Sequence, residues 1–335
     1  MVKSLVTGGA GFIGSHVAKH CLAMGQQVVV LDDLSGGYKF QVPPEATFVE
    51  GSVTDQTLIS QLFAEQAFDY VYHLAAYAAE GLSHFIRRFN YHNNLLGSVH
   101  LINESVKHRV RCFVFTSSIA VYGRGTPPMH EDKIPQPEDP YGIAKYAIEL
   151  DLRAARDMFG LNYVIFRPHN VYGEHQNIGD KYRNVVGIFM HQIMKGEPLT
   201  VFGDGSQTRA FSYVDDVAIP ISKSVTTQKA YNEVFNIGAD QPCTINELTQ
   251  WVGRSFGVVP EINYLHARHE IDHVYADHQK VRSVFGEAHP VPLSEGIARM
   301  SDWAQRIGPR PSHEFGAIEI NERLPEGWGS QASEL

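Results

Sequence analysis

The first half of the chain alternates short apolar runs with segments in which apolar residues recur every three or four positions. The runs predict buried strands at residues 4–7, 27–31, 47–50, 70–74, 112–116 and 162–166. The longer spacing predicts helices at residues 12–24, 55–66 and 143–159, the second capped by Asp55. Strands that alternate with helices of this length indicate right-handed crossovers. We therefore expect an α/β fold with a doubly wound parallel sheet of the Rossmann type.

After Arg167 this rhythm breaks, and the segments become irregular and rich in glycine. Helical spacing remains visible at residues 185–195 and 245–256. The pattern predicts a first domain over 1–168, to which 211–238 return, a smaller C-terminal α/β domain from 169–210 and 239–308, and a tail over 309–335. The tail is rich in Pro, Gly and Glu, so it is expected to run extended over the surface.

Composition limits the classes of partner. Apolar residues make up 43% of the 335 residues, enough for a sizeable core, and the formal net charge is −9. An acidic chain without a basic tract is a poor candidate for non-specific binding to nucleic acid or to an anionic membrane. No apolar run approaches the ~20 residues that span a bilayer, and the N-terminus lacks the pattern of a secretory signal.

Cysteine and histidine usage indicates a reducing compartment and no metal site. Cys21, Cys112 and Cys243 are an odd and widely spread set that forms neither a disulfide framework nor a paired metal motif. A cytoplasmic location is therefore expected. The 17 histidines are scattered and show no spacing typical of zinc ligands.

A glycine-rich turn follows the first predicted strand and opens the first predicted helix. Gly8, Gly11 and Gly14 stand three residues apart, and glycine lets backbone N–H groups approach a pyrophosphate at the positive end of a helix. The second strand ends in Asp32 and Asp33. A carboxylate there can accept both hydroxyls of an adenosine ribose and would repel a 2′-phosphate. Together these features predict dinucleotide binding, with NAD favoured over NADP.

A tyrosine and a lysine stand one helical turn apart at the start of the long helix. Tyr141 and Lys145 share a face, and an ammonium beside a phenol favours the phenolate, so we expect Tyr141 to act as a base with a lowered pKa. Ser118 follows the fifth strand, at the end where parallel strands form a ligand crevice. Its hydroxyl is placed to bind the same substrate oxygen as Tyr141.

Five motifs in order carry a resemblance to a known family. They are TGGAGFIG (7–14), HLAA (73–76), TSSIAVYG (116–123), PYGIAK (140–145) and RPHNVYG (167–173). Over roughly residues 2–285 the chain resembles the extended short-chain dehydrogenases/reductases. The most similar subgroup is the NAD-dependent nucleotide-sugar 4-epimerases of the UDP-glucose/UDP-galactose type.

The resemblance implies roles for individual residues. It makes Tyr141 the general base and acid at the sugar O4, gives Lys145 the nicotinamide ribose, and has Ser118 assist at O4. It implies an NAD site of Gly8, Gly11, Phe12, Ile13, Gly14, Asp32, Asp33, Ser35, Gly36, Ser52, Val53, Leu74, Ala75, Ala76, Asn94, Ser117, Tyr141, Lys145 and Pro168. It implies a UDP-sugar site of Ser118, Tyr141, Asn170, Asn184, Val185, Val201, Phe202, Arg209, Arg268, Asp272 and Val274.

The chain departs from the family pattern at several places. Ser52 stands where an Asp often binds adenine, and Ala78 stands where some epimerases carry a Lys. The usual spacing after Arg268 is absent, so either Glu270 or Asp272 is a candidate for the uridine ribose.

The resemblance leaves the reaction and the sugar partly open. A 4,6-dehydratase is disfavoured, because Ile119 and Ala120 stand where such relatives carry an Asp-Glu pair. A UDP-glucuronate epimerase stays open, since Lys181, Arg183 or Arg88 could meet a carboxylate. A UDP-N-acetylhexosamine epimerase also stays open, because Val274 is smaller than the aromatic residue of strictly hexose-specific members.

Three further classes are weighed against the epimerase. A reductase that exchanges its cofactor is a weaker alternative. A non-catalytic NAD-sensing or RNA-binding member of the fold is disfavoured by the intact set of Ser118, Tyr141 and Lys145 and by the acidic net charge. The apolar helices around 91–108 and 142–159 resemble those that pair in family dimers, so a homodimer is expected.

Overall fold

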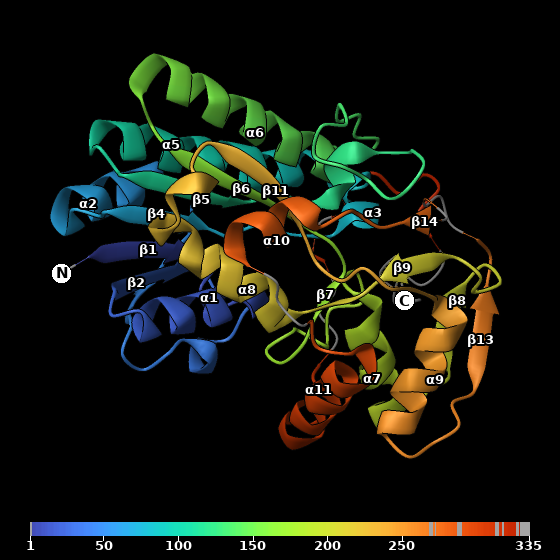
Figure 1. The fold of residues 1–335 in the computed structure, drawn as a ribbon. Coiled ribbons are helices and arrows are strands. Elements are labelled where there is room, and N and C mark those ends of the chain that lie inside the picture. Colours follow the sequence, from blue (N-terminus) through green and yellow to red (C-terminus); the bar gives the residue numbers. More distant parts are fainter. Residues whose placement is uncertain are drawn as a thin grey trace.

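Seven parallel strands form the central sheet of the computed structural model, which describes residues 2–267, 271, 273–286, 290–311, 315–316, 318–325 and 328. The strands are β1 (Lys3–Thr7), β2 (Gln27–Asp32), β3 (Thr47–Glu50), β4 (Tyr70–His73), β5 (Cys112–Thr116), β6 (Tyr163–Pro168) and β11 (Glu233–Ile237). Their order is β11-β6-β5-β4-β1-β2-β3, so the winding direction reverses between β1 and β4 (Figure 1). The prediction of a Rossmann-type doubly wound sheet is confirmed. Such a reversal opens a crevice at the carboxyl ends of the strands.

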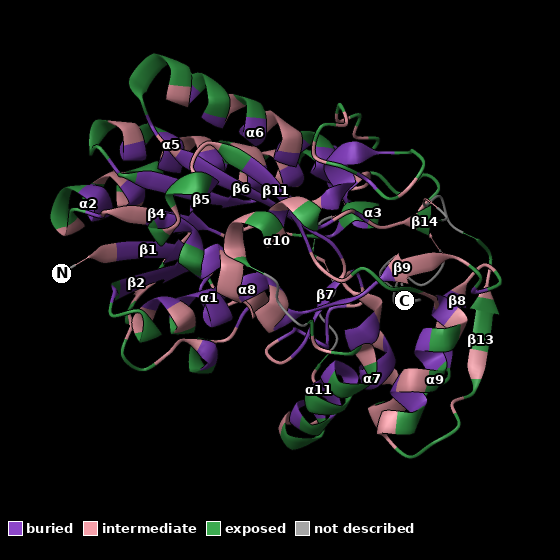
Figure 2. Cartoon of the chain, in the orientation of Figure 1, coloured by how far each residue is buried: buried purple, intermediate pink, exposed green. Residues whose placement is uncertain are grey.

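Helices cover both faces of this sheet because successive strand residues point to opposite sides. Val28 and Val30 pack in one apolar cluster with α1 (Phe12–Ala23), α8 (Val214–Lys223) and α10 (Gln279–Phe285). Val29 and Leu31 pack in another with α2 (Gln56–Gln66), α5 (Gly97–Lys107) and α6 (Pro140–Phe159). Most residues of β1, β2, β4, β5, β6 and β11 are buried, whereas the edge strand β3 has none that is buried; much of the sheet is accordingly purple in Figure 2. Each fully buried Val or Leu contributes about 1.5–3 kcal/mol of hydrophobic free energy.

The helix α6 begins three residues before the predicted position. Asp139 caps it by accepting a hydrogen bond from the backbone N–H of Gly142, and Pro140 occupies the first helical position, where a missing N–H costs nothing. Gly160 ends the helix in the left-handed conformation, with φ of 78°. This early start puts Tyr141 in the first helical turn, at the crevice end of the sheet.

In the part that the structure describes, the smaller lobe carries three small sheets and three helices at the carboxyl end of the large sheet (Figure 1). Its strands are β7 (Val171–Tyr172), β8 (Leu199–Phe202), β9 (Thr208–Ala210), β10 (Ser212–Tyr213), β12 (Pro242–Thr244), β13 (Ile262–Leu265) and β14 (His273–Val274). Its helices are α7 (Val185–Lys195), α9 (Ile245–Ser255) and α11 (Leu293–Ile307). Between β10 and β12 the chain returns to the large sheet as α8 and β11.

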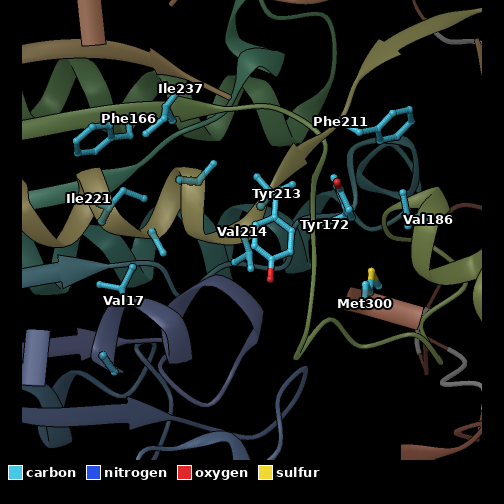
Figure 3. Packing of buried hydrophobic residues seen from close by; sticks show 14 of the residues in the cluster. Val17, Phe166, Tyr172, Val186, Phe211, Tyr213, Val214, Ile221, Ile237 and Met300 are labelled. Atoms are coloured by element: carbon cyan, nitrogen blue, oxygen red, sulfur yellow. The ribbon is translucent and has the colours of Figure 1, made fainter. Parts of the chain in front are cut away.

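The two lobes share one apolar core. Figure 3 shows Phe166 of the large sheet and Val17 of α1 in the same cluster as Val186 and Met300 of the smaller lobe. A continuous core of this kind holds the two walls of the crevice in a fixed relation.

Several short elements complete the chain. They are α3 (Glu80–Ser83), α4 (Arg87–Asn90), a π-helix over Tyr91–Leu96, and 3₁₀ turns at Lys39–Gln41, Ile119–Tyr122, Ser224–Thr226 and Gln228–Ala230. Across the described part of the chain, no helix combines the length and apolarity needed to cross a membrane. The same described residues contain no group of three His, Cys, Asp or Glu side chains placed to hold a metal ion.

Candidate active site

One cavity of about 760 Å³ lies at the carboxyl ends of the sheet strands, between the two lobes. It brings together most residues that the sequence analysis assigned to the site. They are Gly8, Gly11, Phe12, Ile13, Gly14, Asp32, Asp33, Ser35, Gly36, Val53, Leu74, Ala75, Ala76, Ser117, Ser118, Tyr141, Lys145, Pro168, Asn170, Asn184, Val185, Val201, Phe202, Arg209 and Val274.

Two expected cofactor residues do not line this cavity. The Ser52 hydroxyl hydrogen-bonds to that of Thr54, 2.9 Å away. The Asn94 side chain is buried and clamps the backbone of Tyr77, accepting from its N–H and donating to its carbonyl. Asn94 therefore shapes the wall of the site through Tyr77. Arg268, Glu270 and Asp272 lie outside the described residues.

The glycine-rich turn depends on missing side chains at two positions. Gly8 has φ of +71°, in the left-handed region that favours glycine. A Cβ on Gly14 would lie 2.0 Å from the carbonyl oxygen of Gly8, so the helix α1 can pack against the turn only with glycine there. The turn thereby brings the N-terminus of α1 to the cavity.

The N-terminus of α1 suits a phosphate group. Gly11 caps this helix without a side-chain hydrogen bond, and its first turn holds no acidic residue. The first N–H groups of a helix have no intrahelical partner and carry the positive end of the helix dipole. Phe12 and Ile13 line the cavity at this point, so the chain presents donors to an anion there.

Asp32 holds the next part of the site. One carboxylate oxygen accepts from the N–H of Ala10 at 3.0 Å and the other from the N–H of Leu34 at 2.8 Å. Burial raises the pKa of Asp32, and these hydrogen bonds oppose the rise. The carboxylate is thus fixed in direction at the rim of the cavity, which suits the two hydroxyls of a ribose. The glycine-rich turn, the N-terminus of α1 and the carboxylate of Asp32 together fit NAD.

Tyr141 and Ser118 meet at the base of the cavity. The Tyr141 side chain is 7% exposed, and the pKa of its phenol is raised by burial and lowered by a hydrogen bond with Ser118. The sequence analysis expected a lowered pKa for Tyr141. That expectation is wrong, because desolvation raises this pKa by more than the neighbouring groups lower it. Ser118 also accepts from the N–H of Ala120 at 3.1 Å, which fixes its hydroxyl as the cap of a 3₁₀ turn.

Lys145 is buried one helical turn beyond Tyr141. Its Nζ donates to the carbonyl oxygen of Thr116 at 2.7 Å and lies 5.8 Å from the centre of the Tyr141 ring. Burial lowers the pKa of Lys145 to about 7, and the carboxylate of Glu149 opposes that shift. Burial therefore favours the neutral form of Lys145, and Glu149 favours its charged form.

A buried ion pair lies directly behind Lys145. The guanidinium of Arg167 donates twice to the carboxylate of Glu149, at 2.6 and 2.9 Å, and Ser117 donates to the same carboxylate at 2.6 Å. Ser117 borders the cavity, but its hydroxyl is directed into this network. The sequence analysis missed Glu149, although it stands four residues after Lys145 on the same helix.

The smaller lobe contributes the opposite wall. Asn184 caps α7 by accepting from the N–H of Val186, and its amide donates to the carbonyl of Val171. Arg209 is half-buried on β9, beside Val274 of β14. Asn170 has φ of +41°, a conformation that asparagine tolerates better than most residues.

His169 fixes the loop between β6 and β7. Its Nδ1 donates to the carbonyl of Ala210 at 3.0 Å, and its Nε2 lies 3.0 Å from the Nε2 of His278. His278 in turn contacts the carboxylate of Asp240 at 2.8 Å. Burial lowers the pKa of His169 to about 3. These contacts of His169 connect its two neighbours in sequence, Pro168 and Asn170, to the smaller lobe. Both neighbours line the cavity.

Further lining residues come from segments without a recognisable motif. Glu80 and His84 of the α3 region, Lys181, Arg183 and Trp328 all border the cavity, whereas Arg88 does not. Arg183 contacts the carboxylate of Asp180 at 2.8 Å and lowers the pKa of Tyr141. No local spacing could have identified Trp328, because its position depends on contacts with residues far away in the chain.

Fold and site together define an enzyme that binds a nicotinamide dinucleotide. Residues 4–238 match the family model described as the NAD dependent epimerase/dehydratase family. The chain is 33% identical over 308 residues to a UDP-glucose 4-epimerase of Mycolicibacterium smegmatis, covering 89% of this chain and 97% of that one. The chain belongs to the NAD-dependent epimerase/dehydratase family, and its cofactor is NAD.

Solved structures agree with this assignment. UDP-glucose 4-epimerase of Thermotoga maritima with UDP-glucose superimposes with a TM-score of 0.86 at 35% identity, over 91% of this chain and 99% of that one. UDP-glucuronic acid 4-epimerase of Bacillus cereus, in complex with UDP-glucuronic acid and NAD, gives a TM-score of 0.84 at 28% identity, over 91% and 100%. The two similar enzymes act on different sugars, so similarity alone leaves the sugar open.

Proposed function

We propose that this protein is a UDP-sugar 4-epimerase of the UDP-glucose/UDP-galactose type. The observation that carries the proposal is the placement of Tyr141, Ser118 and Lys145 in one cavity with the glycine-rich turn and Asp32. The acid–base tyrosine lies where the proposed substrate and cofactor would meet.

The chain's own residues supply proton transfer and orientation. NAD, held by the glycine-rich turn and Asp32, would supply the hydride transfer from C4 of the sugar and back to its opposite face. Tyr141 takes the proton of the 4-hydroxyl and later gives one back, while Ser118 hydrogen-bonds the same oxygen. Since burial raises the pKa of Tyr141, the ammonium of Lys145 is needed nearby to favour the phenolate.

The smaller lobe is proposed to anchor the UDP group. The forked guanidinium of Arg209 suits a diphosphate, and Asn170 and Asn184 border the same cavity. Binding energy spent on this distant group leaves the sugar ring free to turn, so that both faces of C4 are presented in succession.

The dehydratase reaction of the same family is less well supported. It requires a second acid–base pair beside C6, and the two residues after Ser118 are Ile119 and Ala120. Both side chains border the cavity and neither can transfer a proton. A UDP-glucuronate 4-epimerase is the second candidate, because the cationic Arg183 borders the cavity close enough to Tyr141 to lower its pKa.

We further propose a homodimer and a cytoplasmic location. Ile143, Leu150 and Met158 of α6 are 40%, 46% and 77% exposed, and their spacing of seven and eight residues puts them on one face of that helix. A second copy of the chain would cover this face.

The free thiols of Cys21 and Cys112 are buried, which fits a reducing compartment.

Purified protein incubated with single UDP-sugars tests the catalytic proposal. UDP-glucose, UDP-N-acetylglucosamine and UDP-glucuronate are supplied separately without added cofactor, and products are separated by chromatography. We expect the 4-epimer of UDP-glucose as the main product, made with copurified NAD. A product that has lost water would favour the dehydratase, and turnover of UDP-glucuronate alone would favour the second candidate. Absence of any 4-epimer would overturn the proposal.

A further inference from the structure

The described part of the C-terminal segment folds back onto residues 85–89, which follow the cavity-lining α3 region. Backbone N–H groups of Glu319 and Ile320 donate to the carbonyl of Phe85, at 2.8 and 3.2 Å. The Glu319 carboxylate accepts from the N–H groups of Arg88 and Phe89, both at 2.8 Å. These four hydrogen bonds fix this part of the segment to residues 85–89.

Trp328 is the innermost side chain of this segment. It is 6% exposed and belongs to a cluster with Leu82, Ile86 and Tyr182. Its ring packs edge-on against Tyr182 at 5.3 Å between centroids, and the Tyr182 hydroxyl donates to the Trp328 carbonyl at 3.1 Å. Tyr182 therefore contacts Trp328 both at its ring and at its backbone.

The same indole borders the cavity that also holds Tyr141. Trp328 and Gly81 both line the cavity, and a Cβ on Gly81 would lie 3.0 Å from the Trp328 ring. Two residues after Gly81, the Ser83 hydroxyl accepts from the backbone N–H of Tyr141 at 3.2 Å. The short helix α3 thus connects the indole to the first turn of α6.

Both segments that flank the indole also act on Tyr141. Glu80, next to Gly81, raises the pKa of Tyr141, and Arg183, next to Tyr182, lowers it. An aromatic surface in the cavity that holds the proton-transfer group is suited to the apolar C–H face of a sugar ring.

We propose that Trp328 is a specificity-determining residue, whose indole forms a wall of the compartment for the sugar ring of the nucleotide sugar. This inference rests on the proposed epimerase function and deepens it. The C-terminal segment then serves catalysis by carrying that wall, and the size of the indole limits the substituents that the sugar can bear.

Trp328→Ala and Phe315→Ala form a matched pair for the test. Phe315 packs in the same cluster, against Phe89 at 4.8 Å, but does not border the cavity. Each variant loses one aromatic ring from the cluster, so each reports the cost of loosening the tail. Only Trp328→Ala also removes a wall of the cavity.

Steady-state kinetics with UDP-glucose and UDP-N-acetylglucosamine, and competitive inhibition by UDP, provide the readout. For Trp328→Ala we expect KM for UDP-glucose to rise on the order of threefold to tenfold, as for the loss of one aromatic contact. The inhibition constant of UDP, which has no sugar, should stay unchanged. The rate on the N-acetylated substrate relative to UDP-glucose should rise. Phe315→Ala should leave all three quantities near the wild-type values.

Two further variants keep the test decisive if Trp328→Ala does not fold. Trp328→Phe retains a ring, and Gly81→Ala presses a methyl group against the indole without removing it; both should alter the substrate ratio. Unchanged ratios in the folded variants, or a parallel change in Phe315→Ala, would overturn this inference alone. Failure of the wild-type chain to form any 4-epimer would instead overturn the proposed function, and this inference with it.

Discussion

Burial controls the chemistry of the two ionisable side chains at the base of the cavity. It raises the pKa of Tyr141 and lowers that of Lys145 to about 7, so both groups are pushed towards their neutral forms. The carboxylate of Glu149 opposes the shift at Lys145 and is itself held by Arg167. Glu149, one turn further along α6, therefore favours the charged form of Lys145 against the effect of burial.

The sequence motifs identified some residues of the site and not others. Tyr141, Lys145 and Ser118 were identified from local spacing, because the chemistry of each depends on neighbours in the same strand end or helix turn. Glu149, Arg183 and Trp328 were not assigned their places, since these follow from tertiary contacts. The direction of the Tyr141 pKa shift was predicted wrongly because a sequence does not show desolvation.

Asp32 is expected to determine the choice between NAD and NADP. Asp32→Asn keeps an acceptor for Ala10 or Leu34 but removes the negative charge that would repel a 2′-phosphate. Losing charged hydrogen bonds to the ribose costs about 1.5–3 kcal/mol, so NAD affinity should fall roughly tenfold or more while NADP affinity falls less. Titration of cofactor-stripped protein by calorimetry measures both. Asp33→Asn, at the exposed neighbouring position, is the comparison and should change the ratio less. Equal affinity of the wild type for both cofactors would refute this role of Asp32.

At the scale of elements, His73 ties two strands and a helix together. The Ser98 hydroxyl donates its one hydrogen to the carbonyl of Asn94, so the Nε2–H of His73 must donate to Ser98, at 2.7 Å. The Nδ1 of His73 then accepts from the Thr7 hydroxyl, also at 2.7 Å. The neutral ring thus joins β4 to β1 and α5. Burial, followed by the charge of Lys145, lowers the pKa of His73 to about 3.

This lowered pKa predicts how stability depends on pH. The unfolded chain binds a proton at a histidine with a pKa of about 6.5, whereas folded His73 stays neutral to about pH 3. The stabilisation is fully present above pH 6.5 and is lost as pH falls towards 3, by about 1.4 kcal/mol per pH unit. Urea unfolding of wild type and His73→Gln should therefore show a stability difference that shrinks below pH 6.5. His92→Gln, an exposed position, controls for losing one histidine. A difference independent of pH would contradict the assignment.

Element boundaries were predictable where capping and periodicity agree. The helix α2 begins directly after Asp55, whose carboxylate accepts from the N–H of Leu58 at 3.0 Å, as expected. The start of α6 was placed three residues late, because the apolar spacing begins at Ile143 and the cap at Asp139 was not considered. The π-helix over Tyr91–Leu96 depends on hydrogen bonding that residue periodicity does not show.

At the scale of the whole molecule, the doubly wound sheet could be predicted from the sequence because its strands alternate regularly with helices. The course of the C-terminal segment was not predicted. Its apolar residues Phe315, Ile318, Leu324 and Trp328 follow neither helical nor strand spacing. They are placed by a cluster of aromatic and aliphatic residues in 77–89, more than 200 residues earlier in the chain.

From the exposed apolar face of α6 we expect the wild-type chain to form a dimer. Leu150→Glu places a charge in the middle of this face and should convert a wild-type dimer to a monomer, because a buried unpaired charge is costly at an interface. Light scattering coupled to size exclusion measures the mass, and bound NAD verifies the fold. Ala298→Glu, at an exposed position of α11, should leave the dimer intact. A monomeric wild type would contradict the proposed homodimer.

The central claim is that Tyr141 transfers the proton of the sugar 4-hydroxyl, and Tyr141→Phe tests it most directly. The substitution keeps the ring and its packing but removes the hydroxyl that meets Ser118. The measurement is the rate at which this variant interconverts UDP-glucose and UDP-galactose, compared with wild type at equal content of bound NAD. We predict a fall of about 10²–10⁴-fold with NAD retained, the usual cost of losing a general base. A variant that epimerises within tenfold of wild type would contradict the account.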